Sequence, residues 1–180
     1  MVLPTQDLYT IKDIYELPDG KRAELIDGQI HYIAPPSTDH QRISNYLSTE
    51  INLYIRSKTG NCEVFQAPFA VFLSQDDKTY VEPDISVICS KAKIDSRGCN
   101  GAPDWVVEIV SPGSRYMDYG TKLFKYQFAG VREYWIVDPV KKQITVWNWE
   151  ENDMEMYTFS DSVKAGIYED LCIDFSKINL

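Results

Sequence analysis

Hydrophobic and polar positions repeat with two different periods along the chain, and each period predicts one kind of element. The first segment with helical spacing is Thr10–Glu16, which ends before Pro18-Asp19-Gly20. Two β-prone runs follow, Arg22–Ile26 and Gln29–Ile33, and only Asp27-Gly28 separates them. Because Asp-Gly is a preferred two-residue turn, these runs predict an N-terminal β-hairpin.

A long amphipathic helix is predicted after the break at Pro35-Pro36. Thr38 with Gln41 fits a capping box at its start, and Gly60-Asn61 would end it. Between them, apolar residues recur at helical spacing and form one face: Ile43, Leu47, Ile51, Tyr54 and Ile55. This spacing indicates a helix that packs one side on a core.

The remainder of the chain combines strands with one further helix. Asp104–Val110 is apolar on both faces, which is typical of a central strand. A helix is predicted over Arg115–Ala129, and Gly130 is placed to cap its C-terminus. Strands are also predicted at Cys62–Gln66, Phe69–Leu73, Asp84–Cys89, Glu133–Val137, Gln143–Trp149, Glu155–Phe159 and Leu171–Phe175. This order favours one α+β (α/β-like) domain over residues 1–180, with a central mixed β-sheet flanked by helices.

The composition is that of a folded domain with its own core. The 180 residues are 44% hydrophobic and 13% aromatic, enough for a core without disulfides or a structural metal. No apolar stretch approaches the roughly 20 residues that span a bilayer. The first residues, Met1–Asp7, lack the basic and apolar blocks of a signal peptide. We therefore expect a soluble cytoplasmic protein that makes no membrane contact.

The four cysteines (Cys62, Cys89, Cys99 and Cys172) are scattered and form no Cys-x-x-Cys pair. This spacing gives neither a zinc signature nor the pattern of a secreted disulfide scaffold. Cys89 ends an apolar run and Cys172 lies inside another. We therefore expect reduced cysteines, with these two buried in the structure.

Glu108 is the residue with the clearest chemical implication. It interrupts Trp105–Val110, where every neighbour favours burial. A carboxylate buried there without a partner costs several kcal/mol, as an order of magnitude. A cation, a basic side chain or a raised pKa must compensate, so Glu108 is either a metal ligand or half of a structural ion pair.

A hard cation such as Mg²⁺ takes oxygen ligands from more than one segment. Asp104 precedes Glu108 in the same run, but residues four apart in a strand are separated by about 13 Å. Asp84 begins a different apolar strand, and neighbouring strands lie about 4.8 Å apart. Asp84 is therefore the better partner for Glu108, although Pro83-Asp84 taken alone is more typical of a turn before a strand.

The helix that follows supplies a basic group. Asp118, Lys122 and Tyr126 are four residues apart and share one helix face. They form either an exposed pair that contributes about 0.3–0.5 kcal/mol or a group that directs Lys122 at the carboxylates. Lys125 is an alternative to Lys122 that spacing does not exclude.

Four motifs in this order resemble the Uma-type restriction endonuclease family, a branch of the PD-(D/E)XK nuclease superfamily long described as a domain of unknown function. They are Arg22–Gly28, Val81–Asp84, Gly101–Pro112 and Asp118–Pro139. The resemblance extends from about Tyr15 to Trp147 and implies a restriction-endonuclease-like fold.

The resemblance also implies a role for each matching position. Asp84 and Glu108 would hold Mg²⁺ or Mn²⁺, with the backbone carbonyl of Ile109 as a third ligand. Glu24 would be an accessory acid, and Lys122 would be the catalytic lysine. The wider superfamily places its lysine two residues after the glutamate, where this chain has Val110; Lys122 must therefore reach the site from the following helix.

Two functions follow, with a small-molecule hydrolase that uses the same acids as a weaker third class. The first is an endonuclease that cleaves DNA through a metal-activated water, acting as a homodimer as many nucleases of this superfamily do. The second is an inactive nuclease-like fold that serves as a binding or assembly module. The net charge of −9 favours the second, because phosphate neutralisation supplies most non-specific affinity for nucleic acids.

Other residues receive structural interpretations. His40 lies beside Asp39 and Gln41 near a helix start, where a capping or surface role is favoured over general-base chemistry. Ser111 precedes a proline and has no histidine partner in view, which argues against a serine hydrolase. Three tryptophans in β-prone segments are more typical of a core than of base stacking: Trp135, Trp147 and Trp149.

Overall fold

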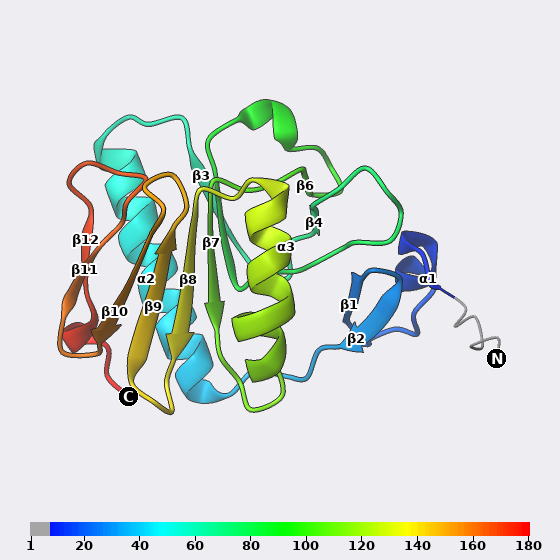
Figure 1. Cartoon of the computed structure of the whole chain (residues 1–180), viewed down its shortest axis with the longest axis horizontal. Helices are drawn as coiled ribbons and strands as arrows, with labels where there is room; N and C mark the ends of the chain where they lie inside the picture. Colours follow the sequence, from blue (N-terminus) through cyan, green and yellow to red (C-terminus); the bar gives the residue numbers. More distant parts are fainter. Residues whose placement is uncertain (1–7) are drawn as a thin grey trace.

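A six-stranded mixed sheet forms the centre of the computed structural model, which describes residues 8–180 (Figure 1). The strand order is β10-β9-β8-β7-β5-β3. Only β7 and β8 run parallel; the other neighbours are antiparallel. The strands are β3 (Glu63–Gln66), β5 (Ile85–Ile88), β7 (Trp105–Ile109), β8 (Glu133–Asp138), β9 (Gln143–Asn148) and β10 (Asp153–Thr158). The predicted mixed sheet is confirmed.

Helices cover both faces of this sheet (Figure 1). On one face, α2 (Thr38–Ser57) packs its apolar side against Val107 and Ile109 of β7. On the other, α3 (Lys122–Ala129) packs against Val106 and Val110. Because successive strand residues point to opposite faces, β7 is buried on both sides, as its sequence predicts.

The N-terminal hairpin has the predicted turn. Strands β1 (Ala23–Ile26) and β2 (Gln29–Tyr32) pair antiparallel, and Asp27 and Gly28 have φ values of 51° and 76°. Positive φ at both positions is what a type I′ turn requires. Backbone hydrogen bonds between Leu25 and Tyr80 join the hairpin to the rest of the protein.

Several short elements complete the chain. They are α1 (Ile11–Tyr15), the parallel pair β4 (Val71–Phe72) and β6 (Cys99–Asn100), the antiparallel pair β11 (Ser162–Lys164) and β12 (Cys172–Asp174), a π-helical turn η2 (Met117–Thr121), and two 3-10 turns, η1 (Lys91–Lys93) and η3 (Phe175–Lys177). The helix predicted over Arg115–Ala129 is continuous but contains this π-helical turn. The strand predicted at Phe69–Leu73 is only two residues long.

Two details of the predicted elements are corrected. Ser37, not Thr38, is the N-cap of α2, and its hydroxyl accepts a hydrogen bond from the His40 N–H. Trp135 lies in the core as expected, while Trp147 and Trp149 are partly buried against the α3 side. No helix within residues 8–180 has the length and hydropathy needed to cross a bilayer.

The expectation of four reduced cysteines is wrong. Cys62 and Cys89 form a disulfide, because β3 and β5 pair with Glu63 opposite Ile88 and so bring the adjoining cysteines together. Cys172 is exposed rather than buried, and the buried free thiol is Cys99. Spacing along the sequence gave no indication of this pairing, since strand register decides it.

The packing of α2 generates a stability prediction. Leu47 is fully buried in the core, whereas Leu53 of the same helix is exposed. We expect Leu47→Ala to lower the free energy of unfolding by about 2–5 kcal/mol, since it leaves a cavity. Leu53→Ala should change it by less than about 0.5 kcal/mol. Urea unfolding measures both, and equal effects would contradict the assignment of the buried face.

Candidate active site

Strand β7 brings Glu108 to the α3 side of the sheet. Its neighbours on that side, Val106 and Val110, belong to the apolar core, and Glu108 is only 4% exposed. The carboxylate therefore lies in the interior, near the C-terminal end of β7. Its compensation must come from the elements packed against that end.

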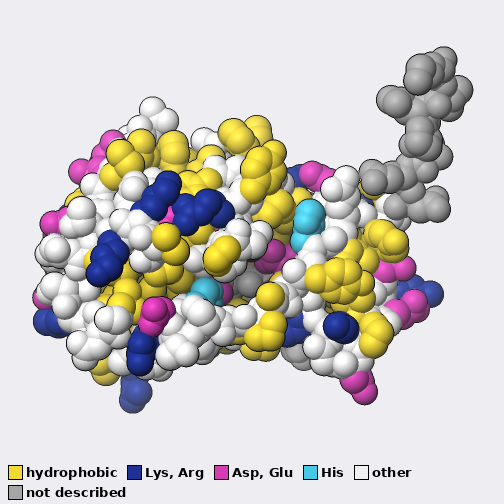
Figure 2. Space-filling view, turned by 90° about the horizontal axis from the view of Figure 1, so that it is seen from below, with side chains coloured by type: hydrophobic (Ala, Val, Ile, Leu, Met, Phe, Trp, Pro, Cys, Tyr) yellow, Lys and Arg dark blue, Asp and Glu magenta, His cyan; other side chains and the backbone are white. Residues whose placement is uncertain are grey.

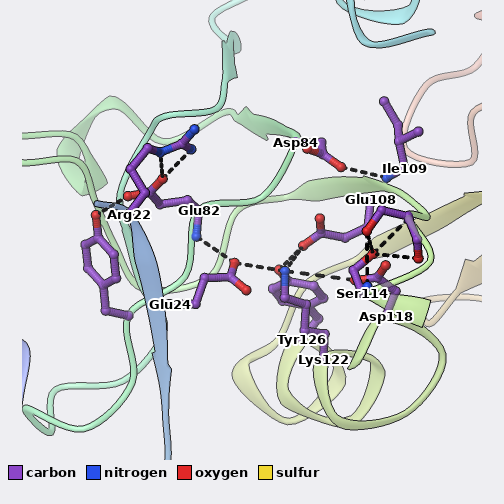
Figure 3. Close-up of polar contacts among 12 residues, drawn as sticks. Arg22, Glu24, Glu82, Asp84, Glu108, Ile109, Ser114, Asp118, Lys122 and Tyr126 are labelled. Carbon is purple, nitrogen blue, oxygen red and sulfur yellow. Dashed lines mark hydrogen bonds and ion pairs between the residues drawn. The ribbon is translucent and has the colours of Figure 1, made fainter. Parts of the chain in front are cut away.

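The compensating groups come from α3 (Figure 3). Glu108 Oε1 accepts hydrogen bonds from Lys122 Nζ at 2.9 Å and from the Tyr126 hydroxyl at 2.6 Å. Lys122 is 5% exposed, so the interpretation as a solvent-exposed helical pair is wrong. The shared helix face of Lys122 and Tyr126 is directed at Glu108.

The N-terminal hairpin closes the cluster from another side. Glu24 of β1 places Oε1 2.8 Å from Lys122 Nζ. The same oxygen accepts the backbone N–H of Glu82 at 2.9 Å, and the Glu82 side chain in turn accepts from Arg22 Nε at 2.9 Å (Figure 3). The ammonium group therefore bridges two carboxylates, one from the hairpin and one from the central strand.

Asp84 lies just before β5 and contacts the end of β7. Its Oδ2 accepts the Ile109 N–H at 2.7 Å, and His40 Nε2 lies 3.1 Å from the same oxygen. In an extended strand the N–H and C=O of one residue point to the same side, so the Ile109 carbonyl faces the Asp84 side of β7. Because both contacts of Asp84 involve Oδ2, Oδ1 is the carboxylate oxygen that remains for a further ligand.

The capping or surface role expected for His40 is wrong. Its side chain is 13% exposed and packs against Asp84, 44 positions along the chain. Within the described residues its Nδ1 is buried without a hydrogen-bond partner. The residue lies in the first turn of α2, but the helix directs its ring toward the acidic cluster.

Asp118 is a fourth acid of the cluster, although its sequence position predicted only that it shares a helix face with Lys122. It is almost fully buried, and its Oδ1 lies 4.0 Å from Lys122 Nζ. Neither side-chain oxygen has a hydrogen-bond partner among residues 8–180. The four-residue spacing to Lys122 was the available signal that it belongs to the site.

Burial and charge shift the pKa values of the cluster. Burial raises the pKa of Glu108 well above its usual value despite the opposing charge of Lys122. Burial likewise raises the pKa of Asp118 to about 6. Burial alone would lower the pKa of Lys122, but Glu108 and Glu24 outweigh it and the pKa is raised. The ammonium group is thus held in its charged form.

Other candidates lie outside this cluster. Lys125 pairs with Asp27 in the hairpin turn, although it is only three residues from Lys122. Asp104 lies at the other end of β7, where it accepts from the Cys89 N–H and pairs with Arg132. Ser111 hydrogen-bonds with Ser114. The lysine position of the wider superfamily, Val110, is buried in the core.

The acids are recessed in the molecular surface. Figure 2 shows acidic side chains in a hollow between the main body and the hairpin, with the two histidines of the chain on either side of it. A group of lysine and arginine side chains stands on the same face. Across residues 8–180, no group of three or more His, Cys, Asp or Glu side chains is arranged so that it could hold a metal ion.

Comparisons with known proteins agree with this fold. The model of the Uma2 family, described as "Putative restriction endonuclease", matches residues 11–171. Two uncharacterized proteins of Synechocystis sp. are similar: slr1290 is 27% identical over 74% of this chain and 70% of its own length. The second, sll1609, is 24% identical over 77% of this chain and 79% of its own length.

A solved structure is also similar. It is described as a putative nuclease belonging to DUF820 from Anabaena variabilis, with a TM-score of 0.76 over 94% of this chain and 96% of that one. The sequence identity is 20%. At that identity the similarity shows the fold, which is the restriction-endonuclease-like fold that the sequence predicted.

The pKa of Asp118 generates a pH prediction. The folded-state pKa of about 6 lies above the ordinary value of 3.8, so the folded state retains a proton that the unfolded state releases. Between about pH 4 and 6 this group therefore reduces the free energy of unfolding as pH rises, by up to about 3 kcal/mol. We expect Asp118→Asn to remove that loss.

Urea unfolding of both proteins at several pH values between 4 and 7 measures the effect. The free energy of unfolding of Asp118→Asn, relative to the unsubstituted protein, should increase across this range. If the free energies of unfolding of the two proteins changed in parallel with pH, Asp118 would ionise at its ordinary pKa.

Proposed function

The chain belongs to the Uma2 family of putative restriction endonucleases, and on that basis we propose that it is a metal-dependent endonuclease that hydrolyses DNA phosphodiester bonds. The observation that carries the proposal is the buried Lys122 ammonium group between Glu24 and Glu108. Asp84 adds a further carboxylate at the end of the same strand. Acids that can hold a metal ion, with a cationic group beside them, are the groups that metal-assisted phosphodiester hydrolysis uses.

Restriction-endonuclease-like nucleases generally use divalent metals, and the donor chemistry here suits one. Four acids interact electrostatically here: Glu24, Asp84, Glu108 and Asp118. Among residues 8–180, Lys122 is the one lysine that pairs with acids of this group, namely Glu24, Glu108 and Asp118. The Asp118 oxygens are buried without hydrogen-bond partners among residues 8–180. Carboxylate and carbonyl oxygens are the ligands that Mg²⁺ and Mn²⁺ prefer.

Asp84, Glu108 and the Ile109 carbonyl would hold the ion. A cation bound there lowers the pKa of its water and polarises the phosphate. The Ile109 N–H and His40 fix Oδ2 of Asp84, so Oδ1 is presented to the ligand. Tyr126 fixes Glu108 in the same way through its hydroxyl.

Lys122 supplies the fixed positive charge of the mechanism. Glu24 and Glu108 hold its ammonium group in place, and a cationic donor held in advance stabilises the negative charge that develops on the phosphoryl oxygens. Glu24 acts through Lys122 and is therefore a positioning residue. A homodimer of the protein would present two such sites, one for each strand of a duplex.

The metal ligands generate the central prediction. Asp84→Asn and Glu108→Gln should each reduce the Mg²⁺- or Mn²⁺-dependent nicking rate of supercoiled plasmid by about 100-fold or more. Glu151→Gln, which removes an exposed acid elsewhere, should leave the rate unchanged. Circular dichroism of each variant confirms that it is folded, and a nicking rate that survives Asp84→Asn would disprove the assignment.

Calorimetric titration with Mn²⁺ separates this function from its alternative. The absence of any three-side-chain group that could hold a metal among residues 8–180 favours an inactive nuclease-like binding module. If no heat of Mn²⁺ binding is detected at millimolar metal, that alternative holds.

The choice of Lys122 over Lys125 as the catalytic lysine generates a further prediction. Lys122→Met should reduce the nicking rate by about 100-fold or more, because it removes the buried charge. Lys125→Met removes a partly exposed lysine of the same helix, whose partner is Asp27, and should change the rate less than about threefold. Thermal unfolding monitors the stability of both variants, and equal losses of activity would contradict the role of Lys122.

A further inference from the structure

An open groove lies beside the acidic cluster, along the outer side of the helix that carries Lys122. It has a volume of about 760 Å³, within the roughly 300–1,000 Å³ typical of sites for small molecules. Its lining includes Arg115, Tyr116, Tyr119, Gly120, Phe124 and Lys141. We propose that this groove binds an unpaired segment of the nucleic-acid substrate next to the cleaved bond. The inference rests on the proposed nuclease function and names the form of its substrate.

Two aromatic rings are exposed along the groove. Tyr116 is 82% exposed and Phe124 is 56% exposed, although large aromatic side chains normally gain stability by burial. Rings that remain in water beside a candidate catalytic site are suited to stacking on bases, since every base has a π-face. Tyr116 and Phe124 thus offer two stacking positions.

Gly120 keeps the space between these rings open. It lies midway between Tyr116 and Phe124 along the helix and lines the same groove. A Cβ atom at this position would meet nothing within 4 Å. The groove floor between the rings is therefore bare backbone, which leaves room for a flat ligand.

The charge of the groove fits a polyanion. Lys141 Nζ lies 5.2 Å from the centre of the Tyr119 ring, and it pairs with no acid in the described part of the chain. Arg115 is neutralised by the buried Asp138. This uncompensated cation is complementary to the phosphate groups of a nucleic-acid strand.

One turn of helix connects the groove to the site. The π-helical turn Met117–Thr121 directs Asp118 into the acidic cluster, while Tyr119 and Gly120 of the same turn line the groove. The groove and the acidic cluster therefore lie on two sides of the same helical turn. Because a duplex hides the faces of its bases, the rings select nucleotides that are unpaired.

Fluorescence anisotropy with a fluorescein-labelled 20-nucleotide oligothymidylate, in EDTA, tests the proposal. The protein should bind this oligonucleotide more tightly than a duplex of equal length. Tyr116→Ala/Phe124→Ala should raise its Kd at least about tenfold, since each stacked base contributes measurably to affinity. Gly120→Leu, which fills the space between the two rings, should also raise the Kd for this oligonucleotide.

Matched controls lie on the same helix and in the same turn. Phe128→Ala removes an 87% exposed ring of α3 that is not part of the groove lining, and it should leave the Kd unchanged. Lys141→Ala should reduce the slope of log Kd against log salt by about one, whereas Lys142→Ala should not.

Three results would overturn the inference. They are no binding of the oligonucleotide, an equal effect of Phe128→Ala, or a dimer that Tyr116→Ala/Phe124→Ala converts to monomer while oligonucleotide binding is retained. Light scattering distinguishes the last case. Because these measurements need neither metal nor cleavage, their failure is separate from a failure of Asp84→Asn to abolish nicking.

Discussion

The buried ammonium group of Lys122 is the interaction on which the rest of the site depends. A charge in a protein interior costs several kcal/mol unless opposite charges and hydrogen bonds compensate it. Glu24 and Glu108 provide that compensation at 2.8 and 2.9 Å. They belong to β1 and β7, so one ammonium group joins the hairpin, the central strand and α3. Removing Lys122 leaves two buried carboxylates without their cation, and removing either carboxylate leaves the ammonium group with one close partner instead of two. The three positions are therefore constrained together.

The charge of the cluster is not balanced, and this imbalance connects the structure to function. Glu108 and Asp118 have raised pKa values because burial disfavours their charged forms, and the other acids of the cluster reinforce the shift. A site built for stability alone would reach balance with basic partners. Excess negative charge at a solvent-reachable strand end can instead be relieved by a bound cation, which is why perturbed acids of this kind mark functional sites.

Much of this site follows from the sequence because local rules decide it. Glu108 stands out in an apolar strand, Lys122 and Tyr126 share a helix face, and Asp27-Gly28 forces a hairpin turn. Other features depend on contacts that no local rule encodes. His40 meets Asp84 across 44 positions, and the disulfide forms because strand register places Cys62 beside Cys89. Helix-start patterns and cysteine spacing describe only residues that are close along the chain. Neither pattern could therefore predict the contact between His40 and Asp84 or the disulfide.

An acidic protein can act on a polyanion if its positive charge is local, because exposed charges farther apart than about 8–10 Å are largely screened at physiological salt. The charges near the proposed cleavage position then matter more than the total of −9. Lys122 lies inside the cluster and Lys141 lies in the groove outside it. Both are placed by the helix of residues 115–129 and the turn that follows β8. The same helix carries the acid contacts on one side and the exposed rings on the other. In the proposed nuclease, this rigid helix would fix the distance between a stacked base and the phosphate to be cleaved, without the need for a mobile loop.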